Sequence, residues 1–124
     1  MNVTVDTSSP IPPYEQLRAG IAGLIAVGAL APGAPLPSVR QLATDLDLAP
    51  GTVQRAYSEL QAAGRIRSRS RRGAVVAEDG PPAEVGERTR EQAVRAAGQF
   101  VERARRLGLG NDEIRGALEA QLAG

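Results

Sequence analysis

The sequence predicts a mainly α-helical chain with one small β-hairpin, in which an N-terminal domain is followed by two further helices. Apolar residues recur with a period of about 3.6 in five segments, and the period changes to two between residues 65 and 76. An acidic stretch rich in proline and glycine, residues 78–86, interrupts the pattern. We therefore expect a domain at 1–77, a linker at 78–86 and a two-helix region at 87–124.

The composition excludes many kinds of chemistry. The 124 residues include no cysteine and no histidine, and all 15 basic residues are arginine. Disulfides, histidine acid–base catalysis, lysine Schiff bases and most zinc sites are thereby excluded, and no convergent cluster of carboxylates or hydroxyls remains. We expect no enzyme activity, no cofactor and no metal. Without a signal peptide or a long apolar run, the expected location is the cytoplasm, with no membrane partner.

The first helix is predicted to follow Pro12 and Pro13. Its expected inner face comprises Tyr14, Leu17, Ile21, Leu24 and Ile25. Gly28 is expected to end the helix. Val3 and Val5 before it alternate over too few residues for more than a short edge strand, and the proline-rich residues 29–37 predict a loop that is neither helix nor central strand.

Residues 36–60 predict two short helices joined by a tight turn. Ser38 can cap the first helix, with Gln41 as its capping-box partner, and Pro50 begins the second after a turn at 47–49. The second helix has an apolar stripe of Val53, Ala56, Tyr57 and Leu60. Its opposite face carries Gly51, Thr52, Arg55 and Ser58, residue types suited to close approach and hydrogen bonding. The pattern is that of a helix-turn-helix, which binds DNA.

The predicted hairpin follows directly and is basic. Two short strands flank a turn at 70–73, and five arginines lie between residues 65 and 72. Residues 1–77 carry eight arginines and five acidic residues, a net charge of +3, whereas residues 78–124 carry a net charge of −2. A charge run alone is usually a solvated surface. Directly after a helix-turn-helix, it predicts a wing that reaches phosphates or the minor groove.

The C-terminal helices have apolar faces too wide to bury against each other. One helix of about twenty residues precedes a shorter helix that Asn111 is expected to cap. Either they dock on the N-terminal domain or they pair with a second chain, and the linker favours pairing. The expected dimer interface comprises Val94, Ala97, Phe100, Val101, Ala104, Leu107, Ile114, Leu118 and Leu122.

Residues 12–76 resemble the DNA-binding domain of the GntR family of bacterial transcription regulators. The motifs are Tyr14-Glu15-Gln16-Leu17, Leu36-Pro37-Ser38-Val39-Arg40-Gln41-Leu42-Ala43, Thr52-Val53, Ser68-Arg69 and Arg72-Gly73. Residues 50–60 and the two-helix tail are similar to the YtrA-like subfamily in particular. Ala49, Gly51 and Arg71 depart from the usual residues at a helix cap, a base-reading position and a wing glycine.

The resemblance implies a winged helix-turn-helix homodimer that binds palindromic double-stranded DNA, with the third helix in the major groove and the wing in the minor groove. The expected DNA-binding residues are Ser38, Arg40, Gly51, Thr52, Gln54, Arg55, Arg69, Arg71, Arg72 and Gly73. The expected function is a sequence-specific repressor of a transport operon and of its own gene. The alternative is a winged-helix module that binds protein without specific DNA binding. A small-molecule effector is compatible with either function, but no polar cluster identifies one.

Overall fold

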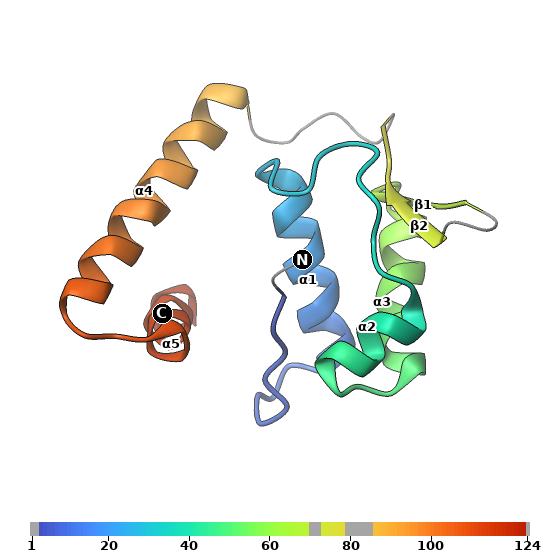
Figure 1. Cartoon of the computed structure of the whole chain (residues 1–124), viewed down its shortest axis with the longest axis horizontal. Coiled ribbons are helices and arrows are strands. Elements are labelled where there is room, and N and C mark those ends of the chain that lie inside the picture. Colours follow the sequence, from blue (N-terminus) through green and yellow to red (C-terminus); the bar gives the residue numbers. More distant parts are fainter. Residues whose placement is uncertain (1–2, 70–72, 79–85, 124) are drawn as a thin grey trace. The chain divides into compact units, whose positions relative to one another are not determined.

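The computed structural model describes residues 3–69, 73–78 and 86–123, which form two compact units, residues 1–85 and 86–124. Within these residues the element order is α1 (Pro13–Ala26), α2 (Val39–Leu46), α3 (Pro50–Ala62), β1 (Ile66–Arg69), β2 (Gly73–Val76), α4 (Glu87–Arg106) and α5 (Asn111–Ala123) (Figure 1). The mainly helical fold with one antiparallel hairpin is as predicted.

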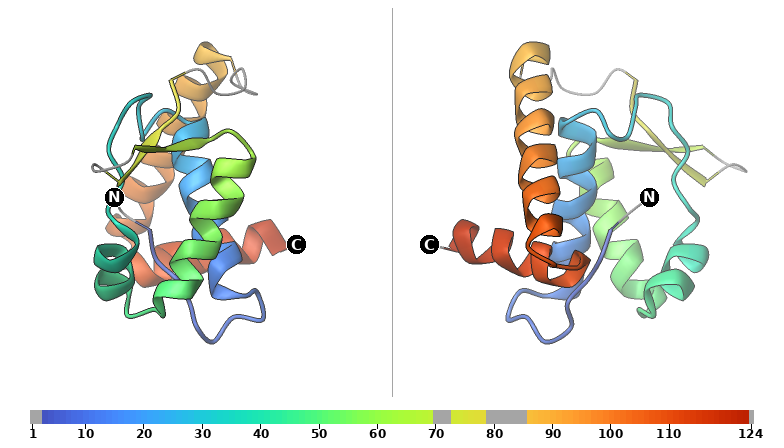
Figure 2. Two further views of the ribbon diagram at one scale, coloured as in Figure 1. Left: turned by 90° about the vertical axis from the view of Figure 1, so that its right-hand side faces the viewer. Right: turned by 60° about the vertical axis from the view of Figure 1, so that its left-hand side comes forward.

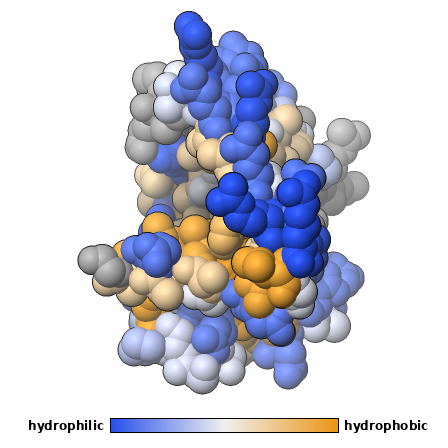
Figure 3. Space-filling view, turned by 90° about the vertical axis from the view of Figure 1, so that its left-hand side faces the viewer, coloured by the Kyte–Doolittle hydropathy of each residue, from blue (hydrophilic) through white to orange (hydrophobic). Residues whose placement is uncertain are grey.

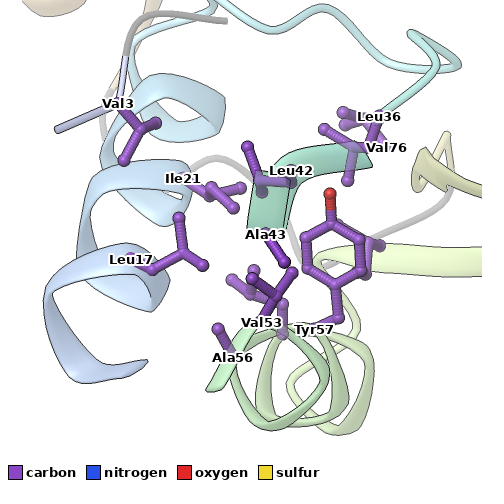
Figure 4. Packing of buried hydrophobic residues seen from close by; sticks show 12 residues of the cluster. Val3, Leu17, Ile21, Leu36, Leu42, Ala43, Val53, Ala56, Tyr57 and Val76 are labelled. Carbon is purple, nitrogen blue, oxygen red and sulfur yellow. The ribbon is translucent and has the colours of Figure 1, made fainter. Parts of the chain in front are cut away.

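The core of the first unit lies between α3 and its neighbours. α1, α2 and β1 all pack on α3, which buries the predicted stripe of Val53, Ala56, Tyr57 and Leu60 (Figure 4). On α1, Leu17 and Ile21 are fully buried, whereas Tyr14, Leu24 and Ile25 are only partly buried. The predicted inner face of α1 is confirmed for its aliphatic residues, because Leu24 and Ile25 still pack against the core, and only Tyr14 lies at its edge.

The helix-turn-helix has the predicted boundaries. The Ser38 hydroxyl accepts a hydrogen bond from the Gln41 backbone N–H at 3.0 Å, as a cap should. The reciprocal capping-box bond was wrongly predicted, because the Gln41 side chain donates to Asp45 Oδ1 at 2.7 Å instead. Asp47 ends α2 in the left-handed conformation (φ 54°), which a short polar residue tolerates, and Pro50 then begins α3.

The wing pairs β1 with β2 in a register that joins Ile66 to Val76 and Arg69 to Gly73. Gly73 was predicted in the turn but begins β2, with φ 73°. Residues 34–36, predicted as loop, lie along β2: the Leu36 N–H donates to the Ala74 carbonyl and the Val76 N–H to the Ala34 carbonyl, both at 2.9 Å. This segment is an irregular edge, where a proline without an N–H is tolerated.

The N-terminal segment packs on α1 without forming a strand in its described residues. Val3 is buried, and its Cγ1 atom lies 3.1 Å from where a Cβ on Gly20 would stand. The Gln16 side chain holds the segment by accepting from the Asp6 N–H and donating to the Asp6 and Ile11 carbonyls. The predicted short edge strand is thus replaced by side-chain hydrogen bonds.

The second unit consists of α4 and α5, with α5 running across one end of α4 (Figure 2). α4 has the predicted length, 20 residues. The prediction that Asn111 caps α5 was wrong: the Glu113 carboxylate accepts from the Gly110 N–H, and Asn111 Oδ1 accepts from Arg105 Nη2 at 2.8 Å. Gly110 therefore occupies the cap position, and Asn111 joins the two helices.

Candidate nucleic-acid interface

The exposed surface of α3 is the first part of the candidate interface. Because α3 buries one stripe, Gly51, Gln54 and Ser58 are exposed on its other side, and Thr52 is half-buried at the edge. The Gln54 Nε2 atom donates to Ser58 Oγ at 3.2 Å along the helix. No heavy atom outside the local chain lies within 4 Å of a Cβ built on Gly51, so the surface at the start of α3 is open. A ridge of small polar side chains on one helix suits insertion into a major groove.

Arg55 lies on the side of α3 that faces α1. Its guanidinium carbon stands 3.7 Å from the centre of the Tyr14 ring, and its Nε lies 3.9 Å from Glu59 Oε1. The side chain is still 61% exposed, so its donors are accessible. The sequence pattern missed Tyr14 as part of this site, because a helical wheel places it with the core residues of α1.

The segment before α2 is fixed to α3 by Tyr57. The buried Tyr57 hydroxyl donates to the Pro37 carbonyl at 2.7 Å, and burial raises the pKa of Tyr57 to about 12. Figure 4 shows the ring between α3 and the segment that carries Leu36. This hydrogen bond positions Ser38 and Arg40, both exposed at the start of α2, relative to α3.

The wing contributes the rest of the predicted set. Gly73 is exposed at the start of β2, and Arg69 ends β1, though only its backbone is described. Arg71 and Arg72 lie outside the described residues. The exposed Arg67 is a further basic residue on β1 that the predicted set omitted.

The predicted interface on α4 and α5 divides into buried and exposed residues. Ala104 and Ile114 are buried, and Val101 is partly buried. Large apolar side chains stay exposed, among them Val94, Phe100 (38%), Leu107, Leu118 and Leu122 (71%). Ala97 on α4 is also exposed. Figure 3 shows apolar residues gathered on the lower part of the face that it draws. Exposed patches of this kind mark interaction surfaces.

Within the described residues, no three acidic, histidine or cysteine side chains lie together as metal ligands. In the same part of the chain, no helix is long and apolar enough to cross a bilayer.

The chain combines a helix-turn-helix, an exposed surface on its second helix and a basic hairpin. These three features define a winged helix-turn-helix protein. The family model described as "Bacterial regulatory proteins, gntR family" matches residues 13–76. The chain belongs to this family, and it is a DNA-binding transcription regulator, as the sequence predicted.

Individual relatives agree with this assignment. The chain is 38% identical over 105 residues to the HTH-type transcriptional regulator Rv1152 of Mycobacterium tuberculosis, covering 85% of this chain and 81% of the relative. It is 39% identical over 77 residues to the HTH-type transcriptional repressor YtrA of Bacillus subtilis, and the match covers 62% of this chain and 59% of the relative. A solved structure, the GntR-family transcription factor YtrA from Sulfolobus acidocaldarius, has a TM-score of 0.57 at 35% identity. The match covers 77% of this chain and 95% of that structure. These relatives are regulators rather than enzymes.

Proposed function

We propose that the chain is a cytoplasmic repressor that binds an inverted-repeat operator as a homodimer and controls a transport operon and its own gene. The observation that carries the proposal is the exposed ridge of Gly51, Gln54 and Ser58 on α3, in the same domain as the basic hairpin. The similar YtrA of Bacillus subtilis is named a repressor, which supports the direction of regulation.

In this proposal α3 enters the major groove and the wing follows the DNA backbone. An α-helix about 10–12 Å across fills a groove about 12 Å wide, so the ridge meets the base edges and the helix flanks meet the phosphates. We assign Gln54 and Thr52 to hydrogen bonds with bases, and Ser38 and Arg40 at the start of α2 to a phosphate. Gly51 allows close approach, as Gly73 does in the wing.

The wing arginines take two roles. Arg69 and Arg71 neutralise phosphates, and Arg72 enters the minor groove. Replacing Arg69 and Arg71 with alanine should flatten the slope of log affinity against log salt by about 0.9 for each phosphate that is no longer neutralised. Arg95→Ala on α4 is the control, because it removes one positive charge outside the wing, and it should leave the salt slope unchanged. An unchanged slope in the double variant would show that the wing is merely solvated.

Arg72→Ala should reduce discrimination between operators with A·T-rich and G·C-rich flanks.

The exposed apolar residues of α4 and α5 form the homodimer interface. Covering a large apolar side chain contributes about 1.5–3 kcal/mol. Phe100→Asp should therefore give a monomer, whereas Gln99→Asp, the neighbouring exposed residue on the polar side of α4, should stay a dimer. Light scattering measures the mass of each. If Phe100→Asp remains a dimer, dimerisation uses another surface.

The operator itself is found by selecting fragments of the source genome on the purified protein and sequencing them. We expect enrichment of an inverted repeat upstream of the chain's own gene and of transporter genes. A gel shift with an excess of unrelated competitor DNA then tests specificity. The protein-binding alternative predicts no shifted band that survives the competitor, and that result would overturn the proposal.

A further inference from the structure

Arg55 is held in place by a residue of another helix. Its guanidinium carbon lies 3.7 Å from the centre of the Tyr14 ring, which belongs to the first turn of α1. The closest approach to Glu59 is through Nε, at 3.9 Å, so the two Nη groups lie at the edge farther from that carboxylate. The charged end of Arg55 is thus fixed between two helices, while most of the side chain is exposed.

We propose that Tyr14 is a positioning residue that holds Arg55 at the α1 side of α3, so that Arg55 binds a backbone phosphate of the operator and not a base edge. The proposal rests on the proposed function, because it assumes that α3 enters the major groove. It assigns Tyr14 a part in DNA binding through Arg55, and it separates Arg55 from the base-reading residues of the same helix.

The stacked geometry is compatible with binding a phosphate. Stacking uses the flat face of a guanidinium, and its N–H donors point outward in the plane of the group. The Arg55 Nη donors therefore stay available for a phosphate while the face stays on Tyr14. Holding the side chain before DNA arrives also reduces the cost in rotamer freedom on binding.

The position of Arg55 favours a phosphate over a base. A helix fills the major groove, so side chains drawn to its flank meet the groove wall, which is the phosphate backbone. Tyr14 draws Arg55 toward α1, whereas the Gln54 amide lies along α3 against Ser58. The carboxylate of Glu59 would repel a DNA phosphate nearby. The guanidinium of Arg55 lies next to this carboxylate, and its positive charge offsets the repulsion.

Four single variants and one double variant test the proposal. Tyr14→Leu and Tyr14→Met lack the ring, Tyr14→Phe keeps it, Arg55→Ala removes the guanidinium, and the double variant combines Tyr14→Leu with Arg55→Ala. Affinity is measured across a salt series on the selected operator duplex and on a scrambled duplex of equal composition, with circular dichroism and a thermal melt to check folding. Arg55→Ala should lower the salt slope by about 0.9 and weaken both duplexes in equal proportion. The ring-free variants should bind both duplexes about two- to fivefold more weakly, Tyr14→Phe should match the wild type, and adding Tyr14→Leu to Arg55→Ala should cost nothing further.

A second measurement does not depend on Tyr14 variants that fold. Operators that carry one neutral methylphosphonate at a time should show a position that weakens wild-type and Tyr14→Phe binding but leaves Arg55→Ala unaffected. The inference is overturned if no such position exists, if a folded ring-free variant binds like the wild type, or if Arg55→Ala changes discrimination without changing the salt slope. If the wild type does not prefer the operator over the scrambled duplex, the proposed function fails instead.

Discussion

Stability at high pH tests the burial of the Tyr57 hydroxyl, which donates to Pro37, because few other groups of this chain titrate there. The chain has no lysine, cysteine or histidine and only two tyrosines, and arginine stays charged. We consider a pair of proteins that both carry Tyr14→Phe, so that Tyr57 is the only phenol of the reference protein. The second protein also carries Tyr57→Phe.

The expected size of the effect follows from the pKa of Tyr57. Burial raises that pKa from 10.0 to about 12 in the folded state. Below pH 10 both states keep the proton, and the stability due to the neutral hydroxyl is fully present. Between pH 10 and 12 the unfolded chain loses the proton while the folded chain keeps it, so the free energy of unfolding falls. Two pKa units correspond to a decrease of about 2.7 kcal/mol once the pH passes the folded-state pKa.

Urea unfolding across this pH range measures the effect. At neutral pH, Tyr57→Phe should be less stable than its reference by about 1 kcal/mol, the net contribution of one hydrogen bond. Because phenylalanine does not titrate, the two stability curves should cross between pH 10 and 12, with Tyr57→Phe the more stable above the crossing. Parallel curves would show that Tyr57 ionises equally in both states, and would refute the burial of its hydroxyl in the folded state.

Four further substitutions test a helix cap and the conformation of the backbone. Ser38→Ala should lower the free energy of unfolding by about 1 kcal/mol in a denaturant titration, because the Gln41 N–H loses its acceptor. Gly73→Ala should lower the free energy of unfolding by about 1–2 kcal/mol, because φ at Gly73 is 73°. Gly23→Ala should raise it by up to about 1 kcal/mol, because Gly23 lies within α1 and a Cβ there would meet no other atom. Gly20→Ala should raise the free energy of unfolding by less than Gly23→Ala does, because its Cβ would lie 3.1 Å from Val3 Cγ1. A double-mutant cycle with Val3→Ala should show that the effects of the two substitutions are not additive.

Periodicity predicted the elements of this fold because each helix buries one clear stripe. The stripe of α3 and the turn chemistry at Asp47 and Pro50 are local signals, and both predictions were confirmed. The Gln41 and Asn111 predictions failed for a common reason. Each of these polar side chains has a second possible partner nearby, and each forms its hydrogen bond with that partner instead. Sequence spacing does not rank such competing partners.

The sequence predicted which face of α3 carries each residue of the candidate site. It did not predict where the functional groups of the long side chains lie. A helical wheel gives the direction of each Cβ, which suffices for short residues such as Gly51 and Thr52. The guanidinium of Arg55 lies several bonds further out, and a ring on α1 decides where it lies. We therefore propose that Thr52 and Gln54 read bases and that Arg55 does not.

A substitution at Gly51 should affect stability and DNA binding in opposite directions. Its φ is not positive and no atom would crowd a Cβ there, so the fold does not require glycine. Glycine inside a helix costs about 0.5–1 kcal/mol relative to alanine, and Ala49 provides α3 with no side-chain cap to offset it. Gly51→Ala should therefore raise the thermal midpoint while weakening operator binding, because the added methyl group holds α3 away from the DNA. Equal operator affinity in a stabilised Gly51→Ala protein would show that α3 does not approach the groove at this residue.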